Sequence, residues 1–231
     1  MFTASRRIVS ESFEFALAAI IAAAVLLTAG SPPARAQNVG SDKKAARTDP
    51  RENCSENAKR LCDEAWAAQP QDVSTNDQDP EKAADLYREA LKDSPRCRLA
   101  LGMLSSLLQR DGKAKEAYEY NEILLGFYPN DSAALLAKAN LLSYWKKDYP
   151  QALIITNDVL ALDGPGNGYL YYLVAEIYSL MNKRDDSLKN LKLAMSINPN
   201  WGDSGNAQDN DGFKNLREDP RFWELVKKPA K

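Results

Sequence analysis

The sequence contains no histidine among its 231 residues. Histidine is the usual general base beside a serine or cysteine nucleophile, a common ligand of zinc and haem iron, and the side chain that changes charge near neutral pH. Its absence excludes a Ser-His or Cys-His nucleophile, a His-ligated metal and a histidine pH switch. No other pattern indicates a metal or an organic cofactor, so we expect neither.

Clustered basic charge is also lacking. Thirty Lys and Arg stand against 32 Asp and Glu, and no run of basic residues is longer than a pair. Nucleic-acid binding depends on a basic stripe or patch, so we expect no nucleic-acid partner. The length and the 44% hydrophobic content indicate one folded domain with appendages.

Long hydrophobic runs are scarce, and the one run of note begins at Phe15 and ends at Ala29. Arg6 and Arg7 precede it, and a small-x-small sequence ends at Ala36. This pattern predicts a secretory signal peptide over residues 1–36, followed by a flexible tether over 37–50. An uncleaved membrane anchor is the alternative, although the run is shorter than the roughly 20 residues of a spanning helix. The signal predicts a periplasmic or secreted protein of a bacterial envelope, without a membrane span after cleavage.

The rest of the chain repeats itself. Pro95 and Pro129 lie 34 residues apart, and Pro129 and Pro199 lie 70 apart, which is two such periods with two residues inserted. Within one unit, apolar and small residues recur at helical spacing on both sides of a turn at Gly112: Leu101, Leu104, Ser105, Leu108, Ala117 and Leu124. Such a period predicts stacked helical hairpins.

The spacing Ala83-x3-Tyr87-x2-Ala90-x4-Pro95 resembles the second helix of a tetratricopeptide repeat (TPR), and it recurs from Ser187 to Pro199. The resemblance covers residues 51–201. It implies an all-α, right-handed α-solenoid of about four helix-turn-helix repeats. The third copy departs most from the pattern, with Lys138, Thr156 and Gly164 at unusual positions, and Asn121 replaces a large apolar residue in the second.

Asp-Pro pairs mark predicted helix starts, because Asp caps a helix N-terminus and Pro fits its first turn. Asp49-Pro50 and Asp79-Pro80 predict the two helices of the first repeat. Asp219-Pro220 predicts a short helix within residues 202–231, which we interpret as a linker and a C-terminal capping helix. A repeat array needs such a cap because its last hairpin has an uncovered face.

Three cysteines occur, and export would place them where disulfides form. Cys54 and Cys62 would lie about 12 Å apart along one helix, too far for a bond. The resemblance puts Cys54 and Cys97 at corresponding positions before two adjacent helices. We therefore favour a Cys54–Cys97 disulfide and expect Cys62 to be a packed core residue.

First helices of this repeat line a concave face. By the resemblance, this predicted groove is lined with Tyr and Leu and carries Leu99, Leu136, Asn140, Tyr144, Tyr169, Tyr172 and Glu176. Only Asn140 matches the residues with which some family members hold a peptide's terminal carboxylate, so that mode is not expected. The alternative is that Tyr169 or Tyr172 packs beneath the C-terminal tail.

The sequence therefore predicts an exported adaptor or scaffold that binds a protein or peptide partner in this groove and performs no catalysis. An obligate accessory subunit or chaperone of a cell-envelope enzyme or of a secretion or assembly complex is a second interpretation. An enzyme that uses only carboxylates, such as Asp158, Asp163 and Glu176, is a third. A homo-oligomer, the connectivity of the disulfide and the identity of the partner stay open.

Overall fold

The computed structural model describes residues 49–51, 53–69, 79–198 and 206–226. The predicted signal peptide, most of the predicted tether and the loop at 70–78 lie outside these residues. All regular elements of the described part are helices. The eight long ones are α2 (Glu56–Ala68), α3 (Pro80–Asp93), α4 (Arg98–Arg110), α5 (Ala114–Phe127), α6 (Ser132–Leu141), α7 (Tyr149–Asp163), α8 (Gly168–Leu180) and α9 (Arg184–Ile197).

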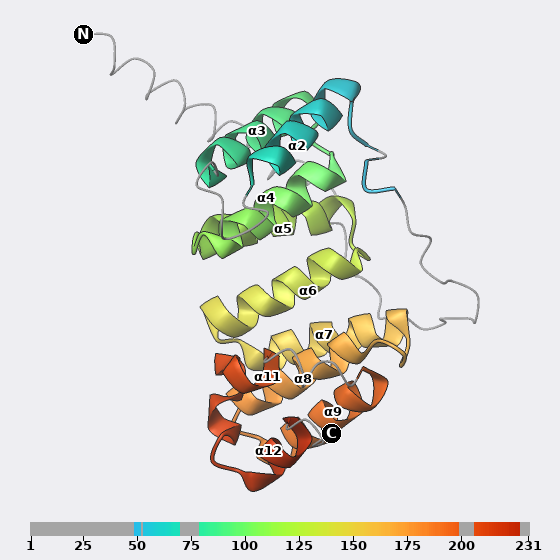
Figure 1. Ribbon diagram of the computed structural model, residues 1–231. Coiled ribbons are helices and arrows are strands. Elements are labelled where there is room, and N and C mark those ends of the chain that lie inside the picture. The colour runs from blue at the N-terminus through green and yellow to red at the C-terminus, as the bar shows by residue number, and fades with distance from the viewer. Residues whose placement is uncertain (1–48, 52, 70–78, 199–205, 227–231) are drawn as a thin grey trace. The chain divides into compact units, whose positions relative to one another are not determined.

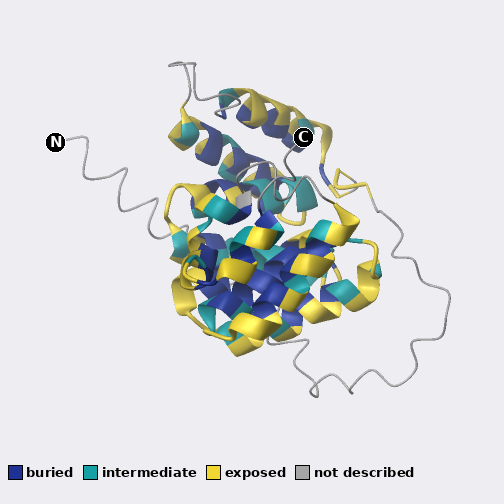
Figure 2. Cartoon of the chain, turned by 60° about the horizontal axis from the view of Figure 1, so that its bottom comes forward, coloured by how far each residue is buried: buried dark blue, intermediate teal, exposed yellow. Residues whose placement is uncertain are grey.

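These helices form four hairpins, α2–α3, α4–α5, α6–α7 and α8–α9, and the second helix of each packs on the first helix of the next. Figure 1 shows this succession from blue α2 to orange α9. In Figure 2 the buried residues colour the helix faces that meet other helices, and the exposed residues colour the outer faces. The prediction of an all-α solenoid of four helix-turn-helix repeats is thereby confirmed.

Small side chains let the helices of a hairpin approach each other. The Ser105 hydroxyl donates to the carbonyl of Ala117 at 2.9 Å, and the Ser187 hydroxyl donates to the carbonyl of Ala175 at 2.6 Å. All four residues are buried. A serine-to-carbonyl bond thus joins the two helices in the second and fourth repeats, with the serine on the first helix in the second repeat and on the second helix in the fourth.

The Asp-Pro signals were right at two of three sites. Asp79 caps α3 by accepting from the Lys82 N–H at 2.9 Å, and Asp219 directly precedes the final helix. The prediction at Asp49-Pro50 was wrong, because α2 begins at Glu56. There the cap is Ser55, which accepts from the Ala58 N–H at 3.0 Å.

Pro50 instead joins the N-terminal segment to α4. Its carbonyl accepts from the Leu99 N–H at 3.1 Å, and a disulfide links Cys54 to Cys97 immediately before α4. The disulfide pairs the two cysteines favoured from the sequence. Cys62 is buried and free, and its burial raises its pKa to about 11.

An unpredicted π-helical turn, η1 (Leu142–Lys146), continues α6. It ends at Lys147, whose φ of 58° lies in the left-handed region. After α9, the C-terminal segment consists of α11 (Asn206–Asp209), the 3₁₀ helix η2 (Asp211–Leu216) and α12 (Pro220–Val226). No helix among the described residues combines the length and hydrophobicity needed to cross a membrane.

The C-terminal segment covers the last hairpin. η2 packs on α8 and α12 packs on α9. Its large side chains Phe213, Leu216 and Phe222 are completely buried. They extend a hydrophobic cluster that begins in α8 and α9, so the segment closes the end of the array.

Candidate functional site

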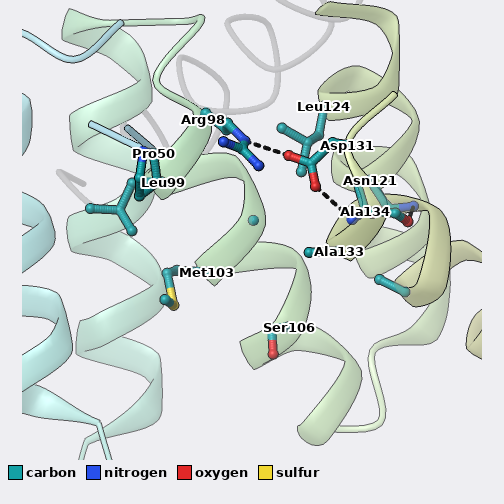
Figure 3. A pocket seen from close by; sticks show the side chains of 12 residues that line it. Pro50, Arg98, Leu99, Met103, Ser106, Asn121, Leu124, Asp131, Ala133 and Ala134 are labelled. Atoms are coloured by element: carbon teal, nitrogen blue, oxygen red, sulfur yellow. Dashed lines mark hydrogen bonds and ion pairs between the residues drawn. The ribbon is translucent and has the colours of Figure 1, made fainter. Parts of the chain in front are cut away.

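A hollow of about 320 Å³ lies between the first helices of the second and third repeats (Figure 3). Its walls are mostly apolar. From α4 come Leu99, Gly102, Met103 and Ser106, and from α6 come Ala133, Ala134 and Ala137. The hollow exists because α6 presents only methyl groups here, so that nothing fills the space facing Leu99 and Met103.

The floor of the hollow is supplied by α5, through Leu124 and Asn121. A side chain at Gly102 would meet Leu124, since an added Cβ would lie 3.7 Å from a Leu124 methyl. The buried Asn121 donates from Nδ2 to the carbonyl of Ala134 at 3.0 Å. Its Oδ1 has no hydrogen-bond partner among the described residues. Asn121 therefore fastens α5 to α6 and makes the floor less apolar than a large hydrophobic residue would.

One end of the hollow carries an ion pair. Arg98 donates from Nε to the carboxylate of Asp131, whose other oxygen accepts from the Ala134 N–H at 3.0 Å (Figure 3). Asp131 is buried and Arg98 is partly exposed. Pro50 also lines the hollow, so the N-terminal segment forms part of its wall.

The structure places the seven predicted groove residues in different environments. Leu99 lines the hollow. Leu136 and Asn140 lie half-buried on α6, outside its lining, and Asn140 is hydrogen-bonded to the Tyr169 side chain. Tyr144 and Tyr169 are exposed to 42% and 37%.

Tyr172 and Glu176 are not available to a partner, because the C-terminal segment covers them. They are exposed to only 4% and 5%. The ring of Tyr172 meets that of Phe213 edge-on, with 5.2 Å between centroids, and its hydroxyl accepts from Asn210 Nδ2 at 3.0 Å. These two residues must be removed from the predicted groove surface, and for Tyr172 the alternative of packing under the tail is the one observed.

Glu176 is the centre of this covered region. Its Oε1 accepts from the hydroxyl of Tyr144 and, at 2.6 Å, from Asn210 Nδ2. Gly212 passes so close that an added Cβ would lie 2.4 Å from the same oxygen. The carboxylate thus connects η1, α8 and the start of η2, and a side chain at position 212 would force Glu176 to move.

The pKa of Glu176 is raised above its usual range by burial, and the hydrogen bonds from Tyr144 and Asn210 oppose that shift in part. No Lys or Arg within the described ranges forms an ion pair with it. Burial likewise raises the pKa of Tyr172 to about 12. This is a structural junction of hydrogen-bonded polar groups beneath the C-terminal segment, and it lies outside the lining of the hollow.

The carboxylates considered for catalysis are not assembled. Asp158 and Asp163 are exposed residues of α7, and Asp163 accepts from the Ser132 hydroxyl at 3.1 Å. Over the described part of the chain, no three His, Cys, Asp or Glu side chains form a group that could hold a metal ion. The structure offers a binding surface at the hollow and shows no arrangement of these carboxylates for chemistry.

Sequence reasoning missed Met103, Ala133 and Ala137 as lining residues. A signal was present, since Ala133, Ala134 and Ala137 place small residues on one side of α6. Small residues at such positions allow either close helix packing or an open space. The periodicity of a single sequence does not distinguish the two outcomes.

Similarity to known proteins is visible at the level of structure. No protein-family model matches the sequence, and no curated protein matches it. A solved structure of MamA from Desulfovibrio magneticus RS-1 superposes with a TM-score of 0.56 at 19% identity, covering 75% of this chain and 95% of that one.

Two other solved structures are TPR proteins by description. One, from Parabacteroides merdae, gives a TM-score of 0.52 at 18% identity and covers 74% of this chain and 70% of that chain. The other, a thermophilic protein of Thermus thermophilus, gives 0.51 at 17% identity over 73% and 94%. Identities this low show the fold alone, and that fold is the stacked helical hairpin of the tetratricopeptide repeat.

Proposed function

We propose that this protein is an exported adaptor that binds a segment of a protein partner and performs no catalysis. The hollow between α4 and α6 is the proposed site. It receives a large apolar side chain of the partner, with Leu99, Met103 and Leu124 as the contacting walls. Export to the bacterial periplasm or beyond is part of the proposal and rests on the sequence of residues 1–36.

The observation that carries the proposal is the open apolar space on the first helices. Peptide segments that bind grooves insert a few apolar side chains and use polar groups at the rim to fix orientation. The hollow has an apolar wall, and the partly exposed guanidinium of Arg98, held by Asp131, lies at one end. A fold of stacked helical hairpins supports this role, since such arrays expose extended binding surfaces.

The test fills the hollow. Ala137→Trp would place an indole in the space that the partner's side chain is proposed to occupy. The matched control is Ala161→Trp, at an exposed position of α7. Both variants of residues 37–231 are used beside the unchanged protein to capture partners from envelope extract, and circular dichroism establishes that each is folded.

We expect one partner to be enriched by the unchanged protein and by Ala161→Trp, and to be lost with Ala137→Trp. A photo-crosslinking residue at Met103 should then join that partner through a single segment. Recovery of the same partner by all three baits would refute the hollow as the binding site. Co-purification in fixed stoichiometry would favour the obligate-subunit interpretation.

A further inference from the structure

A second surface, separate from the hollow, is built around the π-helical turn η1. It consists of Tyr118 from α5 with Tyr144, Trp145, Lys146 and Lys147, and we call it the aromatic–lysine patch. Trp145 is exposed to 41% and Tyr144 to 42%. Large aromatic side chains exposed together are unusual on a soluble surface and are enriched where proteins bind partners.

The backbone explains why these side chains face outward together. A π-helical turn departs from α-helical spacing, and such turns are frequent at functional sites. Here it places two aromatic residues and two lysines in succession, and Lys147 then adopts a left-handed conformation with φ of 58°. The ring of Trp145 leans on that of Tyr118, with 5.8 Å between centroids.

Each lysine is held against a ring. The Lys146 ammonium lies 3.8 Å from the centroid of Tyr118 and 5.2 Å from that of Trp145. The Lys147 ammonium lies 5.9 Å from the centroid of Tyr144. The two positive charges therefore rest on different members of the aromatic group.

Neither Lys146 nor Lys147 forms an ion pair with a carboxylate within the described part of the chain. The ion pairs nearby are formed by other residues. Lys138 is paired with Glu122 at 2.8 Å. Asp211, whose negative charge contributes to raising the pKa of Tyr144, is paired with Arg217 at 3.9 Å. Lys146 and Lys147 therefore bring two positive charges to the patch that are outside the ion pairs formed by the described residues.

From this geometry we infer that the aromatic–lysine patch binds an acidic segment of a protein partner, one with carboxylates on both sides of an apolar side chain. The carboxylates would pair with Lys146 and Lys147, and the apolar side chain would cover Trp145. The ammonium groups are already oriented by the rings, which lowers the ordering cost of binding. This surface is independent of the hollow and would bind even if the hollow does not.

The test uses a defined probe and residues 37–231, which include the compact unit of residues 44–231. The probe is a short fluorescein-labelled peptide with two glutamates on each side of a phenylalanine, followed by fluorescence anisotropy. Comparison peptides replace the glutamates with lysines or the phenylalanine with serine. The protein variants are Lys146→Ala/Lys147→Ala and, as a control with the same charge change, Lys189→Ala/Lys192→Ala at exposed positions of α9.

We expect the acidic phenylalanine peptide to bind best and to bind more weakly as salt is added. Removing Lys146 and Lys147 should weaken it about fivefold to tenfold, as expected for two partly exposed ion pairs, and the α9 control should change it less than twofold. Ala137→Trp, which fills the hollow, should leave this affinity unchanged.

Equal binding of the lysine peptide, equal effects of the two double variants, or no loss on replacing phenylalanine would each overturn the inference. Phosphatidylglycerol vesicles are the remaining comparison. If they bind through Lys146 and Lys147 while the acidic peptide does not, the surface recognises a membrane and the inference is wrong.

Discussion

At the scale of single residues, Glu176 is the most unusual group in the structure. It is a buried carboxylate that receives two hydrogen bonds and lacks an ion-pair partner within the described part of the chain. Burying an ionised carboxylate without a cation is costly, and the group responds by holding its proton to higher pH. This has a measurable consequence for stability.

Because the pKa of Glu176 is higher in the folded state than in the unfolded chain, the folded state binds the proton more strongly. Its contribution is complete below the unfolded pKa and is lost as pH rises through the folded pKa. Glu176→Gln keeps the acceptor for Tyr144 and Asn210 and removes the titration. We therefore expect the variant to gain stability relative to the unchanged protein as pH rises over that interval.

Urea unfolding of both proteins from acid to neutral pH measures this difference. Glu56→Gln is the control, because that carboxylate is exposed on α2 and its pKa is lowered by Lys59. This variant should lose stability relative to the unchanged protein as pH rises. A difference between Glu176→Gln and the unchanged protein that does not vary with pH would contradict the assignment.

At the scale of elements, the first repeat depends on a covalent link. The disulfide joins Cys54 and Cys97, which are 43 positions apart in the sequence, and ties the start of α2 to the start of α4. Closing a loop of this length lowers the conformational entropy of the unfolded chain, which stabilises the folded state by about 4 kcal/mol in the entropic model. We expect Cys54→Ser/Cys97→Ser to lose stability of this order, and hydrogen exchange to show the loss chiefly in α2 and α3.

Reducing agent provides the matched control for that prediction. It should destabilise the unchanged protein to a similar extent and have no effect on the double variant. Equal loss of protection in α8 and α9 would show that the link serves the whole array and not its first repeat.

The helices themselves could be predicted from the sequence because their causes are local. Apolar residues at helical spacing, small residues at contacts, and prolines at the ends define the hairpins from Ala83 to Pro199 without reference to distant parts of the chain. The start of α2 was missed because Asp49-Pro50 is also compatible with a turn, and the distant pairing of Pro50 with Leu99 decided its place.

The candidate site was harder to predict, since it depends on what covers each face. The helix α8 is apolar on most of its surface. The spacing of its apolar residues therefore does not show which face the C-terminal segment covers, and it is Asn210 and Phe213 that cover Tyr172 and Glu176. The π-helical turn was missed for a similar reason. Its residues, Leu142–Lys146, continue the helical pattern of α6 in sequence, and that pattern does not show where the hydrogen bonding becomes π-helical.

At the scale of the whole molecule, the C-terminal segment covers the last hairpin and contributes to the stability of the folded array. Phe213 is completely buried between Tyr172 and Phe222. Replacing a buried Phe by Ala typically costs 3–5 kcal/mol, so we expect Phe213→Ala to lower the melting temperature by about 6–20 °C. Differential scanning calorimetry measures it.

Lys214→Ala, at the exposed neighbouring position of η2, should leave the melting temperature nearly unchanged. A loss with Phe213→Ala no larger than with Lys214→Ala would mean that the C-terminal segment contributes little to the fold. A large loss would establish it as part of the folded unit and would explain why α8 can be apolar on nearly all sides.

Within the described part of the chain, most buried apolar side chains fall into three clusters. One runs from Cys54 through α6, a small one joins α6, η1, α7 and Ile177 of α8, and the third joins α8, α9 and the C-terminal segment. The two large clusters are each assembled from neighbours in sequence, and contacts of that kind form quickly. The chain therefore has two separate places where folding can begin, one at each end. We therefore expect the two ends to form first and the middle hairpin, α6–α7, to pack last, so that substitutions in α6 and α7 change the unfolding rate more than the folding rate.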